Sequence, residues 1–361
     1  MKIILEKRIR SSKLMTYASP VIAIGLTVVL GGIIFALAGY DPLEALYFYF
    51  IDPVITLWSL EEVVVKATPL ILIGAGLAIC FTANIWNIGA EGQLTMGALM
   101  GSFFPVMFSD WQSPSILILM LIFGALGGAA WAGIAAFLKN KFNVNEILTS
   151  LMLVYIAQYI LDWFVRGPWR DPDGFNFPKS VDFEGWQLLP TYGDGRMHIG
   201  AIIAVVIVLA LTIMMSKSMK GFEIRAIGNS RRASAFAGFS YKNMTWFCFL
   251  LSGALAGLAG IIEVAGPAGH LQPSISPGYG FTAIIVAFLG RLNPLGVLFA
   301  GILLAITYLG GDGAQMELGV SAKTAQVFQG MLLFLILACD TLIRYKIKII
   351  RPQANQQEAT L

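Results

Sequence analysis

Charged side chains are scarce in this sequence. Asp, Glu, Lys and Arg make up 12% of the residues, against about 25% in ordinary soluble domains. Hydrophobic residues make up 57% of the chain, and a soluble core of that size needs a charged surface that these residues cannot supply. The composition therefore excludes an ordinary soluble protein and predicts a membrane protein.

Reactive and metal-binding side chains are also rare, with 3 Cys and 2 His in the whole chain. Cys80, Cys248 and Cys339 lie far apart within apolar runs, which is typical of small packed side chains and excludes a disulfide framework or zinc site. His198 and His270 have no partner at metal-ligand spacing, and we interpret both as loop residues. No metal site and no nucleophile–base pair is predicted, so we do not expect an enzyme.

Long apolar runs occupy most of the chain, and a bilayer core roughly 30 Å thick needs runs of about 17–25 residues. The predicted fold class is all-α, a polytopic transmembrane helical bundle with about ten spans. Three prolines and two glycines predict a broken or partly re-entrant segment near residues 267–290. The expected spans are Tyr17–Gly39, Val63–Ala83, Leu94–Phe108, Ser115–Leu138, Glu146–Val165, Ile199–Met215, Met244–Val264, the short run Phe281–Leu289, Leu295–Leu309 and Ala325–Ile343.

The distribution of charge predicts the topology of a single transmembrane domain, 1–361. Basic tracts mark the inside and acidic connections the outside, so both termini are expected in the cytoplasm. The first span is expected to be an uncleaved anchor, because its apolar stretch exceeds the usual signal core. Charges are expected to be nearly absent from the middle of the spans, with Glu263 solvated at an outer helix end. The parts outside the spans include cytoplasmic tails at 1–16 and 344–361, an external insert at 166–198 and a cytoplasmic segment at 217–243.

A polar decapeptide, Asn84–Gln93, interrupts two apolar runs. Each unsatisfied polar group costs several kcal/mol in hydrocarbon, so such a stretch survives only at a membrane surface, inside a bundle or along a wet cavity. The predicted topology places it nearer the cytoplasmic side, which favours a gate. Its polar side chains can hydrogen-bond a solute, and an aromatic ring can stack on one; alternatively, Asn87 and Glu91 cap helix ends and fix the bundle. The candidate path or gate residues are Asn84, Trp86, Asn87, Glu91, Gln93 and Phe281.

The cytoplasmic segment 217–243 is rich in Lys and Arg and has a single acid, Glu223. Asn229 or Ser230 can cap a short helix that ends at Gly238. Within that helix Arg231 and Arg232 lie on the polar side and Phe236 on a small apolar face. Taken alone, the segment also fits an orientation-setting basic loop that contacts anionic membrane lipid.

Three blocks of sequence carry a family resemblance: GFEIRAIGNSRRASAFAGFS in the basic segment, NIGAEGQ in the decapeptide, and GYGFTAIIVAFLGRLNPLG at Gly278–Gly296. Together they resemble the permeases of bacterial ABC importers in the ribose, branched-chain amino acid and nucleoside branch. Trp86 stands where the family usually has Phe, and Asn229–Ser230 departs mildly from the usual order. The resemblance implies that the basic segment docks on the ATPase through Gly221, Glu223, Arg225, Gly228, Arg231, Arg232, Phe236 and Gly238.

The resemblance also implies the function: import of a nucleoside or related sugar-containing solute across the bacterial plasma (inner) membrane. The chain has no G-x-x-x-x-G-K-[ST] phosphate loop, so ATP and Mg²⁺ belong to a separate ATPase and no cofactor is expected here. The other expected partners are an external solute-binding protein or lipoprotein and a second permease subunit, identical or related, with no nucleic acid. Alternatives are the same importer class acting on a simple sugar or amino acid, an ion-coupled secondary transporter, and a membrane-embedded enzyme.

Overall fold

The computed structural model describes all residues except 1, 8–12, 112, 193–194, 322 and 351–361. These residues form two compact units: residues 1–46 with 326–361, and residues 47–325. The prediction of one domain over 1–361 stays a prediction, because the two units are described separately. Parts of both predicted tails, 1–16 and 344–361, lie outside the described residues.

The first unit combines terminal strands with helices. Strand β1 (Lys2–Lys7) pairs antiparallel with β2 (Tyr345–Ile350), with Lys2 opposite Ile350. The helices are α1 (Lys13–Leu37), most of α14 (Lys323–Arg344) and the start of α2 (Pro42–Phe50). The rings of Phe35 and Phe328 meet at 5.3 Å between centroids and join α1 to α14. The all-α prediction did not include this strand pair.

The second unit is a helical bundle around α3. A hydrogen bond from the Ser59 N–H to the Thr56 hydroxyl, 3.0 Å long, caps the start of α3. Because α3 contacts α8, α11, α12 and α13, 89% of its apolar stretch is buried. The elements are η1 (Asp52–Val54), α3 (Leu57–Thr82), α4 (Ala90–Gly101), α5 (Phe103–Met107), α6 (Pro114–Phe142), α7 (Glu146–Arg166), η2 (Gly185–Gln187), α8 (Gly200–Lys217), α9 (Met219–Asn229), α10 (Arg231–Phe236), α11 (Tyr241–Glu263), the π-helical turn η3 (Val264–Ala268), α12 (Tyr279–Leu289) and α13 (Pro294–Leu318).

Among the described residues, six helices are long and apolar enough to cross a membrane: α3, α6, α7, α8, α11 with η3, and α13. Shorter apolar helices cover Val21–Leu37, Tyr279–Leu289 and Gln326–Ile336. The prediction of a helical membrane bundle is confirmed, and the count of about ten spans stays a prediction. The expected span Leu94–Phe108 is divided between α4 and α5.

Small residues allow the central helices to approach closely. A Cβ atom added at Gly97 of α4 would collide with the backbone of Gly257 in α11, and one added at Gly128 of α6 would collide with Gly253 and Gly257. The glycine spacing predicted such close packing, which van der Waals contact favours in membrane bundles.

Two half-length helices, α4 and α12, begin inside the bundle. Residues 85–89 lead into α4 without helical structure, and residues 269–278 lead into α12 in the same irregular way. The N-termini of the two helices meet, because the Gly280 N–H donates to the Glu91 carboxylate at 2.6 Å. The expected break near 267–290 is therefore present, and a second break precedes α4.

Candidate functional site

The decapeptide Asn84–Gln93 begins at an exposed residue, Asn84, and continues into the buried interior of the bundle. The side-chain amide of Asn87 donates to the Ser252 hydroxyl at 3.1 Å, and Ser252 is the middle residue of α11. The Ile88 N–H donates to the Ser150 hydroxyl of α7 at 3.2 Å. The decapeptide therefore reaches inside the bundle, one of the three locations that its polarity allowed, and its expected position nearer the cytoplasmic side stays a prediction.

Asn87 and Gln93 form a closed pair of amides. Each side chain donates to the other at 2.9 Å, and the Asn87 oxygen also accepts from the Gly89 N–H at 3.1 Å. Asn87 is fully buried and Gln93 nearly so. These contacts satisfy the polar groups inside the protein, so this pair fixes the backbone at the start of α4.

Glu91 caps the start of α12. It is 3% exposed, and its carboxylate accepts the Gly280 N–H in the first turn of that helix. A carboxylate at this position also interacts favourably with the positive end of the helix dipole. A Cβ atom at Gly280 would collide with the Glu91 backbone, so only glycine lets the two helix ends meet. This geometry matches the alternative in which Asn87 and Glu91 hold the bundle together.

The remaining predicted path residues have different surroundings. The Trp86 ring lies 5.1 Å from Phe81 and 6.2 Å from Phe288 between centroids, and its N–H donates to the Asn84 side-chain oxygen at 3.1 Å. Trp86 is thus already stacked within the protein. Phe281 in α12 is 40% exposed, and the structure does not bring it to the Asn87–Gln93 pair.

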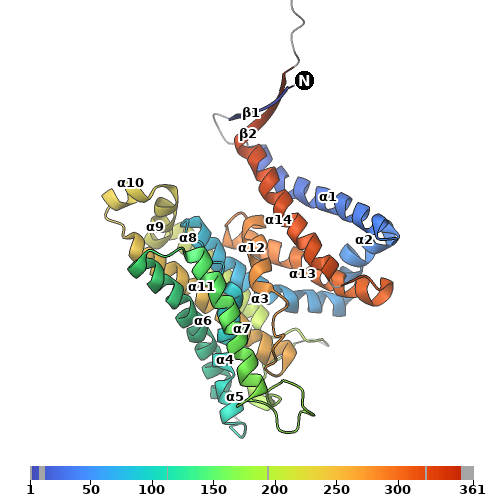
Figure 1. The fold of residues 1–361 in the computed structure, drawn as a ribbon, viewed down its shortest axis with the longest axis vertical. Helices are drawn as coiled ribbons and strands as arrows, with labels where there is room; N and C mark the ends of the chain where they lie inside the picture. Colours follow the sequence, from blue (N-terminus) through green and yellow to red (C-terminus); the bar gives the residue numbers. More distant parts are fainter. Residues whose placement is uncertain (1, 8–12, 112, 193–194, 322, 351–361) are drawn as a thin grey trace, which may run out of the picture. The chain divides into compact units, whose positions relative to one another are not determined.

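The basic segment folds into two short helices, α9 and α10, at the end of the bundle opposite α5 (Figure 1). The Ser230 hydroxyl accepts the Ala233 N–H at 3.3 Å and caps α10. Gly238, with φ of +85°, follows α10 in the left-handed conformation that glycine favours. The predicted caps of this short helix are confirmed.

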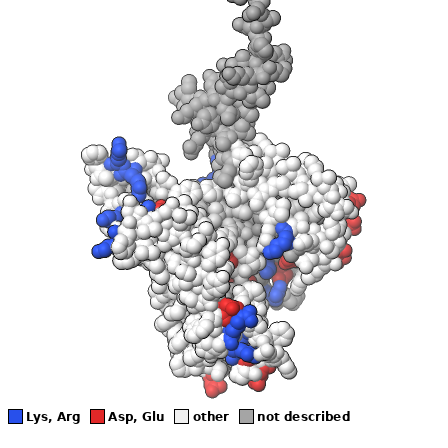
Figure 2. All heavy atoms as spheres, viewed as in Figure 1, with Lys and Arg blue, Asp and Glu red and all other residues white. Residues whose placement is uncertain are grey.

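The tip of α10 projects from the protein. Phe236 is 95% exposed, and Arg232 is also exposed. The Arg231 guanidinium stacks 3.3 Å above the centre of the Tyr241 ring, which fixes its direction. Figure 2 shows Lys and Arg gathered over this end of the unit. The result is an apolar ring surrounded by positive charge.

Tight contacts attach α9 to the membrane helices. Gly228 lies against the Thr82 carbonyl at the end of α3, and Gly221 lies against the Met214 and Met215 carbonyls at the end of α8, with no room for a Cβ atom at either glycine. The Arg225 guanidinium donates to the Met215 carbonyl oxygen.

A salt bridge of 2.7 Å joins Lys220 to Glu223 within α9. The predicted coupling residues Gly221, Glu223, Arg225 and Gly228 therefore hold α9, whereas Arg232 and Phe236 face outward.

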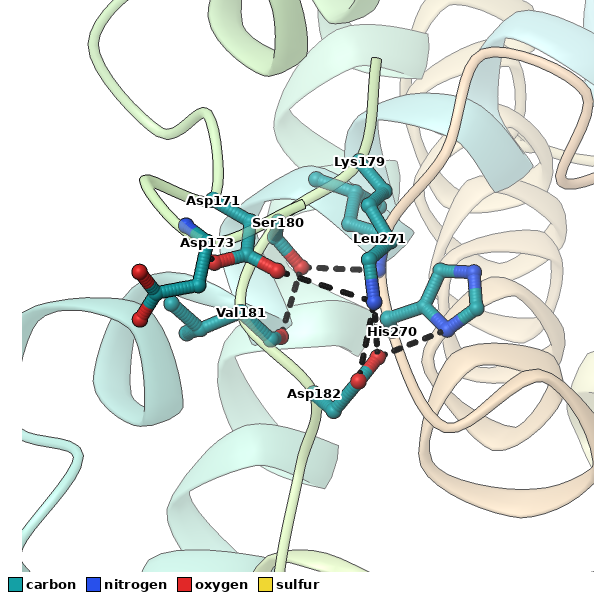
Figure 3. Close-up of polar contacts among 8 residues, drawn as sticks. All are labelled: Asp171, Asp173, Lys179, Ser180, Val181, Asp182, His270 and Leu271. Atoms are coloured by element: carbon teal, nitrogen blue, oxygen red, sulfur yellow. Dashed lines mark hydrogen bonds and ion pairs between the residues drawn. The ribbon is translucent and has the colours of Figure 1, made fainter. Parts of the chain in front are cut away.

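An ionic cluster organises the insert 166–198 (Figure 3). Lys179 lies between Asp171, at 3.6 Å, and Asp182, at 2.8 Å, and His270 reaches Asp182 at 3.2 Å. The hydrogen bond from Lys179 to Asp182 raises the pKa of the lysine above its usual value. These surface pairs orient the insert, and each contributes little to stability.

Backbone hydrogen bonds tie the insert to the segment that leads into α12. The Ser180 N–H donates to the Leu271 carbonyl and the Leu271 N–H to the Ser180 hydroxyl, both at 2.9 Å. Farther along, the Phe183 N–H donates to the Gly269 carbonyl at 2.7 Å. The described part of the insert is therefore bound by backbone hydrogen bonds to residues 265–271.

A polar cluster that the sequence prediction missed lies between α3, α11 and α12. The Lys66 ammonium donates to the Tyr279 hydroxyl at 3.1 Å, which donates to Glu263 at 3.4 Å. Glu263 is 6% exposed, so the expectation that it is solvated is wrong. The detectable signal was Lys66 itself, a cation within the expected span Val63–Ala83.

An ion pair and a buried histidine lie near this cluster. Arg196 binds both oxygens of Glu62, at 2.9 and 2.5 Å. His198 is 2% exposed and accepts the Gly200 N–H at 3.2 Å, and burial lowers its pKa to about 4. As expected, neither histidine is in a helix: His198 lies in the connection before α8 and His270 in the connection before α12. Among the described residues, no group of three or more His, Cys, Asp or Glu could hold a metal ion.

Comparison with known proteins gives the family. Residues 59–337 match the family model of the branched-chain amino acid transport system permease component. The glucose ABC transporter permease protein TsgB13 of Haloferax volcanii is 35% identical over 93% of this chain and 90% of its own length. The guanosine ABC transporter permease protein NupP of Bacillus subtilis is 30% identical over 90% and 94%. The nucleoside ABC transporter permease protein NupB of Lactococcus lactis subsp. cremoris is 27% identical over 94% of each chain.

The family match covers the decapeptide, both half-helices and the α9–α10 segment. It assigns the bundle a transport role in which ATP hydrolysis belongs to another chain, and it confirms the resemblance carried by the three sequence blocks. The chain belongs to the permease-component family of ABC transport systems, and it is a membrane-spanning transport subunit without enzymatic activity of its own.

Proposed function

We propose that this chain is one permease half of an ATP-driven importer that carries a nucleoside or a related sugar-containing solute into the cell. The relatives named for glucose, guanosine and nucleosides support this solute class. The observation that carries the mechanism is the projecting tip of α10, where Phe236 is 95% exposed beside Arg231 and Arg232.

In this proposal α10 docks on the ATPase. Exposed aromatic side chains surrounded by positive charge are favourable anchors in protein interfaces. Movement of the ATPase then reaches α3 through Gly228, which touches the Thr82 carbonyl without an intervening side chain. Different contacts at α10 before and after nucleotide hydrolysis would bias the equilibrium between outward-open and inward-open states.

In the proposed topology the chain crosses the plasma membrane ten times, and both termini lie in the cytoplasm. The six long spans, the three shorter apolar helices, and α4 with its extended approach supply these crossings. The basic α9–α10 end then faces the cytoplasm. The insert 166–198 faces outward, where it meets a solute-binding protein, and a second permease chain, identical or related, completes the pore.

The decisive test replaces Phe236. The permease is reconstituted in proteoliposomes with its ATPase and receptor, and ATP-dependent solute uptake and ATPase co-purification are measured. We expect Phe236→Asp to abolish both, because the interface loses its apolar anchor. The matched control is Phe175→Asp: Phe175 is 93% exposed in the insert, and this variant keeps its ATPase. Normal assembly and uptake with Phe236→Asp would overturn the docking assignment.

Solute identity is tested in the same liposomes. Uptake of radiolabelled guanosine and glucose is competed by nucleosides, ribose and amino acids. We expect nucleosides or sugars to compete and amino acids not to compete. Uptake by the permease alone, driven by an ion gradient without ATP, would contradict the proposed ATP-driven mechanism.

A further inference from the structure

The Lys66–Tyr279–Glu263 cluster has a fixed hydrogen-bond direction. An ammonium group only donates, so the Tyr279 hydroxyl accepts from Lys66 at 3.1 Å and donates its proton to Glu263 at 3.4 Å. Tyr279 is fully buried and Glu263 is 6% exposed, whereas Lys66 is half-buried. A cation and a carboxylate are thus held on either side of one phenol within an apolar bundle.

The cluster leaves hydrogen-bonding capacity unused. The Lys66 ammonium has three donors, and among the described residues it forms one hydrogen bond and no ion pair. Glu263 accepts one long hydrogen bond through Oε1, and its Oε2 has no partner among those residues. Polar groups in a membrane bundle are costly when unsatisfied, so such capacity marks a functional site.

The neighbouring pair of Arg196 and Glu62 provides a contrast. The Arg196 guanidinium occupies both Glu62 oxygens, at 2.9 and 2.5 Å, in the bidentate geometry of a completed ion pair. Both carboxylate oxygens of Glu62 are therefore occupied by Arg196. In the Lys66–Tyr279–Glu263 cluster, by contrast, donors of Lys66 and one oxygen of Glu263 have no partner among the described residues.

The cluster also lies where the two broken segments meet. Tyr279 is the first residue of α12, and the next residue, Gly280, contacts the start of α4 through Glu91. Discontinuous helices of this kind place binding groups near the middle of a membrane, because irregular backbone is tolerated only where it lines a protein or solute site.

We propose, on the basis of the importer function proposed above, that Lys66, Tyr279 and Glu263 form a recognition site for a vicinal diol of the transported solute. One hydroxyl accepts a hydrogen bond from the Lys66 ammonium, and its neighbour donates to the free oxygen of Glu263. The two side chains carry opposite charges, so the site suits a neutral polyol. Sugars and ribonucleosides share this diol, and an analogue without it would leave both charged groups unpaired.

The test uses the complete transporter in proteoliposomes, with the receptor saturated by the solute so that receptor affinity does not set the rate. Uptake of radiolabelled guanosine is compared with that of 2′,3′-dideoxyguanosine; for a sugar transporter, glucose is compared with 2,3-dideoxyglucose, which has no two hydroxyls on adjacent carbons. We expect the wild type to prefer the diol at least tenfold. Lys66→Met and Glu263→Gln should each reduce diol uptake about tenfold, with less than a twofold change for the deoxy analogue.

Two further variants distinguish loss of the diol site from misfolding of the protein. Tyr279→Phe keeps the ring and removes the hydroxyl, and we expect a loss of preference at an unchanged melting temperature. Arg196→Met is the structural control, and we expect it to lower the melting temperature while the diol preference stays intact. Preference retained in folded Lys66, Glu263 and Tyr279 variants overturns the diol site and leaves the importer function standing. A wild type that carries neither nucleosides nor sugars overturns both proposals.

Discussion

The carboxylate of Glu91 and the backbone N–H of Gly280 are separated by 189 positions in the sequence, yet they meet at 2.6 Å inside the bundle. This hydrogen bond joins the first turns of α4 and α12, the two half-length helices. A change at Glu91 is therefore expected to affect α12, although α12 lies far away in the sequence.

Replacing Glu91 tests the hydrogen bond that joins α4 to α12. Glu91→Ala leaves a buried N–H without its acceptor, so we expect a loss of about 1.5–3 kcal/mol, the usual value of a hydrogen bond to a charged group. Glu91→Gln retains an acceptor and should lose less. The measurement is the thermal unfolding of the purified permease in detergent. Equal melting temperatures for wild type and Glu91→Ala would show that the hydrogen bond does not hold α12.

Enlarging Gly228 tests the contact between α9 and α3. A methyl group there collides with the Thr82 carbonyl, and overpacking of this kind costs about 1–3 kcal/mol. We expect Gly228→Ala to keep ATPase binding through α10 and to lose ATP-driven uptake. The matched control is Gly25→Ala, because a Cβ atom at Gly25 has no neighbour within 4 Å. Normal uptake by Gly228→Ala would refute transmission through this contact.

Thiol labelling tests the proposed topology. Cys80, Cys248 and Cys339 are buried, so background labelling is expected to be low. We expect a cysteine at the exposed Asp173 to react with an impermeant thiol reagent added outside intact cells. A cysteine at Arg232 should react only after the membrane is opened. The reverse pattern would invert the topology.

Acid stability tests the environment of His198. Its folded pKa of about 4 lies below the ordinary value of about 6.5, so the unfolded chain binds more protons between these values. Stability is therefore complete above pH 6.5 and declines as the pH falls toward 4. Between pH 7.5 and pH 5 we expect this histidine to contribute a loss of about 2 kcal/mol.

The matched variant is His198→Asn, which can still accept the Gly200 N–H but does not titrate. Melting temperatures in detergent at pH 7.5 and pH 5 are compared for both proteins, and the variant should show the smaller decrease. Equal decreases would mean that other groups cause the acid sensitivity.

Local features were predictable from the sequence because they depend on neighbouring residues. Ser230 caps α10, and Gly238 follows it with a positive φ, as the spacing of small and polar residues indicates. The break before α12 was also predictable, because Pro273 and Pro277 cannot continue a helix. Periodic apolar runs identified the long membrane helices.

The partners of the decapeptide inside the bundle were not predictable, since they depend on where the chain turns after α3 and on contacts with distant helices. Nothing near Asn87 in the sequence indicates that Ser252 will be its partner. The partners of Lys66 and Glu263 were hidden for the same reason, because Tyr279 joins them only when α12 packs against α3 and α11. The roles of the path and coupling residues stay predictions.

The hydrogen bonds between Ser180 and Leu271 have a mechanical consequence for the transport cycle. Only a short stretch of chain separates Leu271 from Tyr279, the residue that begins α12 and touches Lys66. In the proposed topology, a receptor that binds the insert is therefore connected through this stretch to the start of α12. We expect binding of a loaded receptor to alter the contact between Tyr279 and Lys66 before the solute is released.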